Sequence, residues 1–111
     1  MSQNPGAISA SAGATVLIVD DQPSNIQMVG SQLAAAGFDV MPARSGEQAL
    51  ARIRARTPDL ILLDLLMPGI DGFAVLAQLR ADSQLAALPV IVLTALQDRQ
   101  LLVRAFTAGA V

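Results

Sequence analysis

Cysteine and histidine are both absent from this chain of 111 residues. Their absence excludes a thiol nucleophile, a disulfide, a zinc site with thiolate or imidazole ligands, and a catalytic triad of the Ser-His-Asp kind. Any metal must therefore be bound by oxygen atoms. Lysine is absent too, because all 7 basic residues are arginine. These arginines do not cluster, and 9 acidic residues bring the formal net charge to −2, so we expect no direct contact with nucleic acid by this segment.

Long hydrophobic runs are also missing. The longest ones, Leu60–Leu63 and Val90–Leu93, are far shorter than the roughly 20 residues that a membrane-spanning helix needs. The amino terminus has no basic region and no apolar stretch typical of a targeting signal. We therefore expect a flexible leader over residues 1–13, one domain over residues 14–111, no membrane association and a cytoplasmic location. The hydrophobic content of 53% is sufficient for a packed core.

Four short and nearly continuous apolar segments are typical of strands that are covered on both faces. They lie at residues 15–20, 38–43, 59–64 and 89–94. The second segment contains Pro42 and is more typical of a sheet edge.

Between the strands, apolar residues recur at the helical spacing of three and four. Pro23 and Gly37 mark the start and end of the first helix, and Ser45 with Gln48 predicts a capping box for the second. The apolar stripes of a third and a fourth helix consist of Phe73, Leu76 and Leu79, and of Leu102, Ala105 and Phe106.

This alternation predicts an α/β fold, a doubly wound parallel sheet with helices on both faces and right-handed crossovers. Ligands bind to such sheets beyond the carboxyl ends of the strands, where the strand order reverses. Asp20 and Asp21 follow the first strand, Asp64 ends the third and Thr94 ends the fourth. If the first and third strands are neighbours, as in the order 2-1-3-4-5, the three carboxylates converge.

Three adjacent carboxylates would repel one another, and a hard divalent cation would relieve that repulsion. Mg²⁺ is the natural choice where carboxylate, carbonyl and water oxygens are the ligands. A carboxylate beside bound Mg²⁺ can attack a phosphoryl group and form an acyl phosphate. The pattern therefore predicts a metal-assisted phosphate site.

Each of these residues has a simpler interpretation when taken alone. Asp21 could cap the helix that begins near Pro23, Asp64 could form a turn, and Thr94 is a common residue type in strands. Their placement at one end of one sheet favours a shared site, since independent caps and turns have no reason to gather there.

The segments VLIVDDQPSN, LILLDLLMPGIDGFAVL and PVIVLTA, in this order and spacing, resemble the receiver domains of two-component response regulators, the chemotaxis-regulator-like family. The resemblance implies that Asp64 is the phosphoacceptor, taking a phosphoryl group from a histidine of a sensor kinase or phosphotransfer protein. It implies that Asp21 binds Mg²⁺ directly, that Asp20 acts mainly through water, and that the backbone carbonyl of Leu66 is a further ligand. Thr94 would be the switch hydroxyl that bonds a phosphoryl oxygen.

The same resemblance implies a flavodoxin-like (βα)5 receiver fold over residues 14–111. A complete receiver has a fifth strand ending in lysine and a fifth helix, whereas this chain lacks lysine and ends where that strand should begin. We therefore expect a receiver lacking most of its fifth strand and fifth helix, with an output domain C-terminal to this segment. An unpaired fourth strand would expose an apolar edge and invite self-association.

Three functions remain open at this stage. The first is a phosphorylated signalling switch rather than an enzyme. The second is a receiver-like interaction module that is not phosphorylated, which the missing lysine favours. The third is an aspartyl-phosphate phosphohydrolase, which is disfavoured because Leu66 stands where such an enzyme would carry its general acid.

Overall fold

The computed structural model describes residues 13–64 and 71–92. In chain order its elements are β1 (Thr15–Val19), α1 (Pro23–Ala35), β2 (Asp39–Ala43), α2 (Gly46–Ala55), β3 (Leu60–Leu63), α3 (Gly72–Ala81) and β4 (Val90–Val92). Within these ranges the predicted alternation of strands and helices is confirmed. The predicted fourth helix, and nearly all of the predicted leader, lie outside the described residues.

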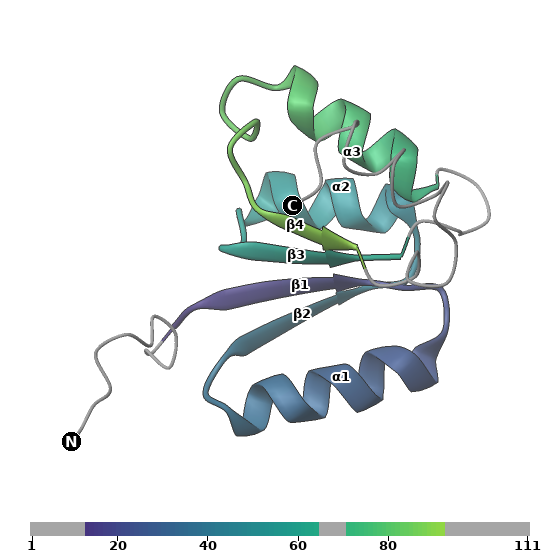
Figure 1. Cartoon of the computed structure of the whole chain (residues 1–111), viewed down its shortest axis with the longest axis vertical. Helices are drawn as coiled ribbons and strands as arrows, with labels where there is room; N and C mark the ends of the chain where they lie inside the picture. Colours follow the sequence, from purple (N-terminus) through teal and green to yellow (C-terminus); the bar gives the residue numbers. More distant parts are fainter. Residues whose placement is uncertain (1–12, 65–70, 93–111) are drawn as a thin grey trace.

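The described strands form one parallel sheet in the order β2-β1-β3-β4 (Figure 1). The first and third strands are neighbours, which is the condition on which the expected convergence of the carboxylates depended. In the register of that pair, Val19 of β1 lies opposite Leu63 of β3. The chain therefore leaves β1 toward β2 on one side and returns to β3 on the other, which makes the carboxyl ends of β1 and β3 the switch point.

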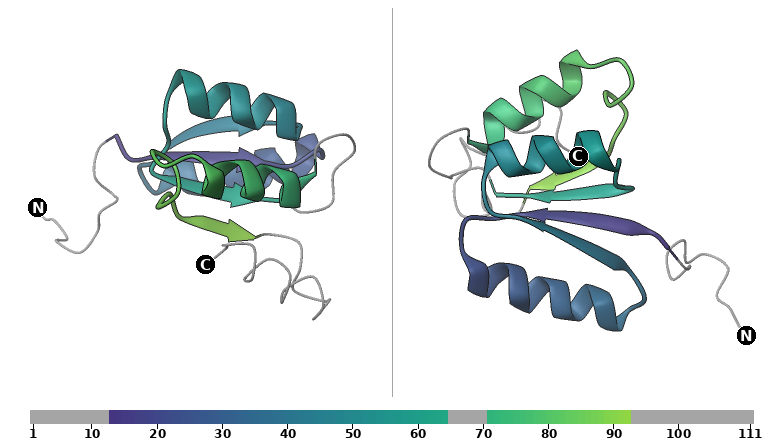
Figure 2. Two further views of the ribbon diagram at one scale, coloured as in Figure 1. Left: turned by 90° about the horizontal axis from the view of Figure 1, so that it is seen from above. Right: turned by 180° about the vertical axis from the view of Figure 1, so that it is seen from behind.

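Helices cover both faces of the sheet. Helix α1 lies on one face, and α2 and α3 lie together on the other (Figures 1 and 2). The core is divided in the same way because successive side chains of a strand point to opposite faces. Leu17 and Val19 of β1 belong to the cluster under α2 and α3, whereas Val16 and Ile18 of the same strand pack toward α1.

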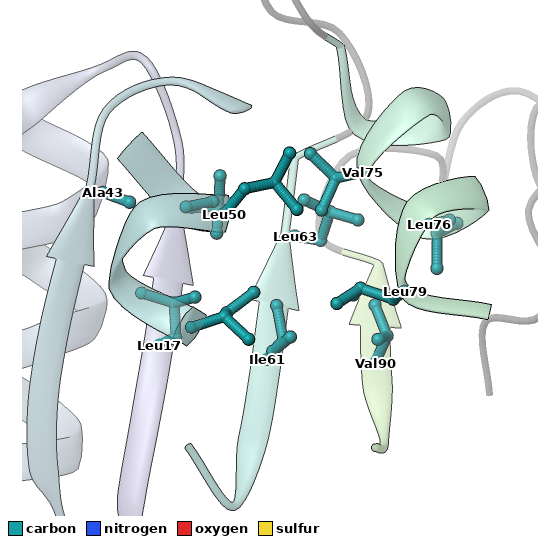
Figure 3. Close-up of a cluster of buried hydrophobic side chains, with 12 residues drawn as sticks. Leu17, Ala43, Leu50, Ile61, Leu63, Val75, Leu76, Leu79 and Val90 are labelled. Carbon is teal, nitrogen blue, oxygen red and sulfur yellow. The ribbon is translucent and has the colours of Figure 1, made fainter. Parts of the chain in front are cut away.

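The larger cluster joins the sheet to α2 and α3. Leu17, Ile61 and Leu63 meet Leu50 from α2 and Leu79 from α3 (Figure 3), and all five are buried. Because side chains alternate between faces, a shift of one residue in strand register would exchange the two clusters. Burial on both faces therefore holds β1 and β3 in register, and with them the residues that follow.

The helix ends follow local capping chemistry. Ser45 Oγ accepts a hydrogen bond of 3.1 Å from the backbone N–H of Gln48, which confirms half of the predicted capping box. The return bond differs, since Gln48 Oε1 accepts from the N–H of Arg44, one residue before the cap. Asp71 caps α3 by accepting from the N–H of Ala74 at 3.0 Å. Gly37, after α1, has a φ of 100°, a backbone conformation that favours glycine.

Two strand ends differ slightly from the sequence prediction. β1 ends at Val19 and β3 at Leu63, one residue before the ends of the predicted segments, so Asp20 and Asp64 both come directly after their strands. β4 lies at an edge among the described strands, and its Ile91 side chain is exposed. Self-association through that edge stays a prediction. Within residues 13–64 and 71–92, every helix is too short or too polar to cross a lipid bilayer.

Candidate metal centre

Asp20 and Asp64 are held at one level of the sheet by backbone hydrogen bonds. The N–H of Asp20 donates to the carbonyl of Ala43 in β2 at 3.0 Å, and the N–H of Asp64 donates to the carbonyl of Val19 in β1 at 2.8 Å. The hydrogen-bond ladder thus extends one residue beyond each strand. Because the strands are parallel and in register, both side chains begin at the same edge of the sheet, beside Asp21.

The three carboxylates converge as predicted. One oxygen each of Asp20, Asp21 and Asp64 lies within 4.8 Å of the others. Asp20 is 2% exposed and Asp64 is 5% exposed, whereas Asp21 is half-buried. The site is therefore a largely buried cluster of acidic groups at the switch point of the sheet.

Such a cluster is electrostatically costly without a cation. Two unit charges 4.8 Å apart repel by about 3.5 kcal/mol at an effective dielectric constant of about 20. Oxygen ligands sit about 2.1 Å from Mg²⁺, which places neighbouring ligands about 3 Å apart and opposite ones about 4.2 Å apart. The observed limit of 4.8 Å is slightly wider. A small rotation of the side chains, or one intervening water, brings the three oxygens to that geometry, so these residues fit a divalent cation.

The two acidic residues after β1 have different surroundings. Asp20 Oδ1 accepts a hydrogen bond of 2.9 Å from the N–H of Gln22, and Asp20 Oδ2 accepts one of 3.2 Å from Nδ2 of Asn25. Asp21 makes no hydrogen bond or ion pair with the described part of the chain. The protein therefore holds Asp20 in place, while the Asp21 carboxylate remains available for a cation.

The interpretation of Asp21 as a helix cap is wrong. The residue at the N-cap position of α1 is Gln22, and its side chain makes no capping hydrogen bond. The contact from Asn25 was not predicted from the sequence. The available signal was its position, since Asn25 is the third residue of a helix that begins three residues after Asp20, and side chains in a first turn lean back toward the amino end.

Two predicted site residues, Leu66 and Thr94, lie outside the described residues. Their roles as a carbonyl ligand and as a switch hydroxyl stay predictions. By sequence, Thr94 follows β4 by two residues, and the last residue of β4, Val92, is paired with Leu63 just before Asp64.

The acidic residues at the opposite end of the sheet serve a structural purpose. Asp59 Oδ2 accepts a hydrogen bond of 2.7 Å from the N–H of Thr15, the first residue of β1. Arg56 donates to Thr15 Oγ1 at 3.1 Å and lies 3.9 Å from Asp39, in an exposed ion pair. These carboxylates each pair with a donor or a cation, and they do not gather into a cluster as the three at the carboxyl end do.

Comparisons with known proteins point in one direction. The family model described as the response regulator receiver domain matches residues 16–111. The transcriptional regulator RpaA of Synechocystis is 42% identical over 95 residues, which cover 86% of this chain and 39% of that relative. The chain thus spans about two fifths of the length of this curated relative.

Solved structures agree with the family match. The chemotaxis protein CheY4 of Vibrio cholerae superposes with a TM-score of 0.82 at 35% identity, covering 89% of this chain and 82% of that one. The phosphorylated cyanobacterial phytochrome response regulator RcpA superposes with a TM-score of 0.81 at 30% identity, covering 89% and 77%.

Proposed function

The chain belongs to the receiver domains of two-component response regulators, and from this premise we propose that it is a phosphoacceptor switch with Asp64 as the acceptor. The observation that carries the proposal is the convergence of three carboxylates, two of them buried, at the carboxyl ends of β1 and β3. The donor we propose is a phosphohistidine of a sensor kinase or of a phosphotransfer protein.

In the proposed reaction, a carboxylate oxygen of Asp64 attacks the phosphorus of the phosphohistidine. A P–O bond forms while the P–N bond breaks, and the departing imidazole nitrogen keeps the electron pair and takes a proton from solvent. The backbone bond from Asp64 to Val19 supports this role because it fixes where the nucleophilic side chain begins. Bound Mg²⁺ would neutralise charge on the phosphoryl oxygens.

The metal ligands follow from the different surroundings of the acidic residues. We assign Asp21 and Asp64 as direct ligands, with the backbone carbonyl of Leu66, and Asp20 as a residue that acts mainly through water. Both oxygens of Asp20 accept hydrogen bonds, whereas Asp21 has none with residues 13–64 and 71–92, and this difference supports the division.

The switch we propose is a shift between two conformations that the phosphoryl group favours unequally. Thr94 would bond a phosphoryl oxygen, and its sequence position just after β4, the strand paired with β3, supports that role. The altered surface would be read by an output domain or a partner protein in the cytoplasm. In this scheme the chain is a signalling domain rather than an enzyme.

A second candidate is a receiver-like module that binds partners without being phosphorylated. It shares the fold and the acidic cluster with the first candidate and differs from it in leaving Asp64 unmodified.

Intact-mass measurement after incubation with phosphoramidate and Mg²⁺ separates the two candidates. We expect the unmodified chain to gain one phosphoryl increment, and to lose that gain in EDTA or in the variant Asp64→Asn. Asp59→Asn is the matched control, since Asp59 precedes the same strand that Asp64 follows, and it should be phosphorylated normally. If the unmodified chain gains nothing, or Asp64→Asn gains the same increment, the proposal is wrong.

A further inference from the structure

We propose that Asn25 is a positioning residue of the metal centre, which holds the carboxylate of Asp20 so that it serves the cation through water. This inference rests on the proposed function, because it takes the three carboxylates to be a metal site. It concerns a residue outside the acidic cluster, contributed by the first turn of α1.

The geometry places the Asn25 amide against Asp20. Asn25 is the third residue of α1, and its backbone N–H is bonded to the carbonyl of Gln22 at 3.1 Å, which fixes the start of its side chain. From there the side chain reaches back toward β1, and its Nδ2 lies 3.2 Å from Asp20 Oδ2.

The chemistry fixes which end of the amide faces the carboxylate. An ionised carboxylate can only accept hydrogen bonds, so the NH₂ group of Asn25, and not its oxygen, must point to Asp20. Asn25 is exposed whereas Asp20 is 2% exposed, so the amide reaches from the surface to a buried carboxylate. With the N–H of Gln22 on the other oxygen, both oxygens of Asp20 have a protein donor.

This arrangement suits a water-mediated contact with the cation. A carboxylate has about four lone-pair sites, of which two are used here, so each oxygen can still accept a proton from a metal-bound water. A carboxylate that is held by two donors is also less free to turn onto the cation than its neighbour Asp21. Loss of the Asn25 donor would let Asp20 move and would weaken the ordered water shell.

Direct measurement of Mn²⁺ binding tests the role of Asn25. The chain has no tryptophan or tyrosine, so electron paramagnetic resonance of free Mn²⁺ is a suitable readout. We expect Asn25→Ala to bind Mn²⁺ about tenfold more weakly, the lower end of what loss of such an outer hydrogen bond costs. Asn25→Gln keeps the donor on a longer side chain and should recover part of the affinity. Gln32→Ala removes an exposed amide from the same helix and should bind as the unmodified chain does.

A purely structural role for Asn25 gives a different result. In that case Asn25→Ala would lower the melting temperature in EDTA and leave the Mn²⁺ affinity of the folded protein unchanged, which would overturn the inference. Asn25→Leu, which keeps the branched shape without the donor, provides a second reading if the alanine variant does not fold.

Nuclear magnetic resonance of the unmodified chain provides a reading that needs no variant. The side-chain NH₂ signals of Asn25 should shift during Mg²⁺ addition with the midpoint of metal binding, while those of Gln32 should stay in place. Unmoved Asn25 signals during saturable Mg²⁺ binding would overturn this inference and leave the proposed function intact. An unmodified chain that binds neither ion would overturn both.

Discussion

Replacing Asp21 with asparagine should stabilise the metal-free protein and greatly weaken its response to Mg²⁺. Asp21→Asn keeps the shape of the side chain and removes one of three charges whose oxygens lie within 4.8 Å of one another. Since Asp21 has no hydrogen bond or ion pair with the described residues, the substitution leaves none of their partners unpaired. The main effect in EDTA is therefore relief of repulsion from Asp20 and Asp64.

The size of the effect follows from that separation. At 4.8 Å each pair repels by about 0.9 kcal/mol in a water-like dielectric and by about 3.5 kcal/mol at a dielectric constant of about 20. Asp21 is half-buried and repelled by two carboxylates, so we take a value near the lower limit, about 2 kcal/mol in all. For a domain of this size, that corresponds to a rise in melting temperature of about 8 °C.

In Mg²⁺ the unmodified chain should be more stable than the Asp21→Asn variant, the reverse of the order in EDTA. At a concentration one hundred times its dissociation constant, the ion stabilises the unmodified chain by about 2.7 kcal/mol, whereas the variant lacks a ligand and gains much less. Thermal unfolding followed by far-ultraviolet circular dichroism, in EDTA and in Mg²⁺, measures both effects. Glu47→Gln is the control, because it makes the same charge change at an exposed site in α2 and should respond to Mg²⁺ as the unmodified chain does. An Asp21→Asn variant that is destabilised in EDTA, or that keeps the full Mg²⁺ response, would refute the electrostatic reasoning.

Three further predictions concern the fold and can be checked by urea unfolding followed by circular dichroism. Gly30→Ala should stabilise the protein by up to about 1 kcal/mol, because alanine has a higher helix propensity than glycine. A Cβ at Gly30 would meet Val40 and Ile18 at 3.5 and 3.7 Å, which is ordinary van der Waals contact, so no clash offsets this gain. A destabilised variant would contradict the packing of α1 on the sheet. Asp59→Ala should cost about 1–2 kcal/mol, because the N–H of the buried Thr15 loses its acceptor, and an unchanged unfolding midpoint would show that the bond contributes nothing. Leu79→Ala should cost about 3 kcal/mol, because Leu79 is fully buried between α3 and the sheet; a loss below 1 kcal/mol would argue that α3 is not packed as described.

Strand positions could be predicted from the sequence because they depend on local patterns, whereas the pairing of the first and third strands entered only as a condition. Apolar runs of the length of Leu60–Leu63 indicate strands that are buried on both faces, and alternation with helices leaves few arrangements of a parallel sheet. The convergence of Asp20, Asp21 and Asp64 followed from that pairing, since parallel strands end at a common edge. This convergence could be expected without knowing in which direction each side chain points.

The contacts that depend on side-chain direction could not be predicted in the same way. The N-cap residue is Gln22 rather than Asp21 because of where the chain turns from β1 into α1. No local sequence pattern encodes the position of that turn. The reach of Asn25 to Asp20 depends on the same turn. The Asp71 cap was obscured because Asp71 follows a stretch of sequence rich in turn-forming residue types, next to which an aspartate has several common roles.

The most direct test of the central claim is to locate the phosphoryl group on the chain. After incubation with a phosphodonor and Mg²⁺, borohydride reduces an aspartyl phosphate to homoserine, and peptide mass spectrometry identifies the position of the converted residue. We predict conversion at position 64 alone, and only when Mg²⁺ is present. Conversion at Asp20 or Asp21, or conversion that is equally efficient in EDTA, would contradict the assignment of Asp64 as the metal-assisted phosphoacceptor.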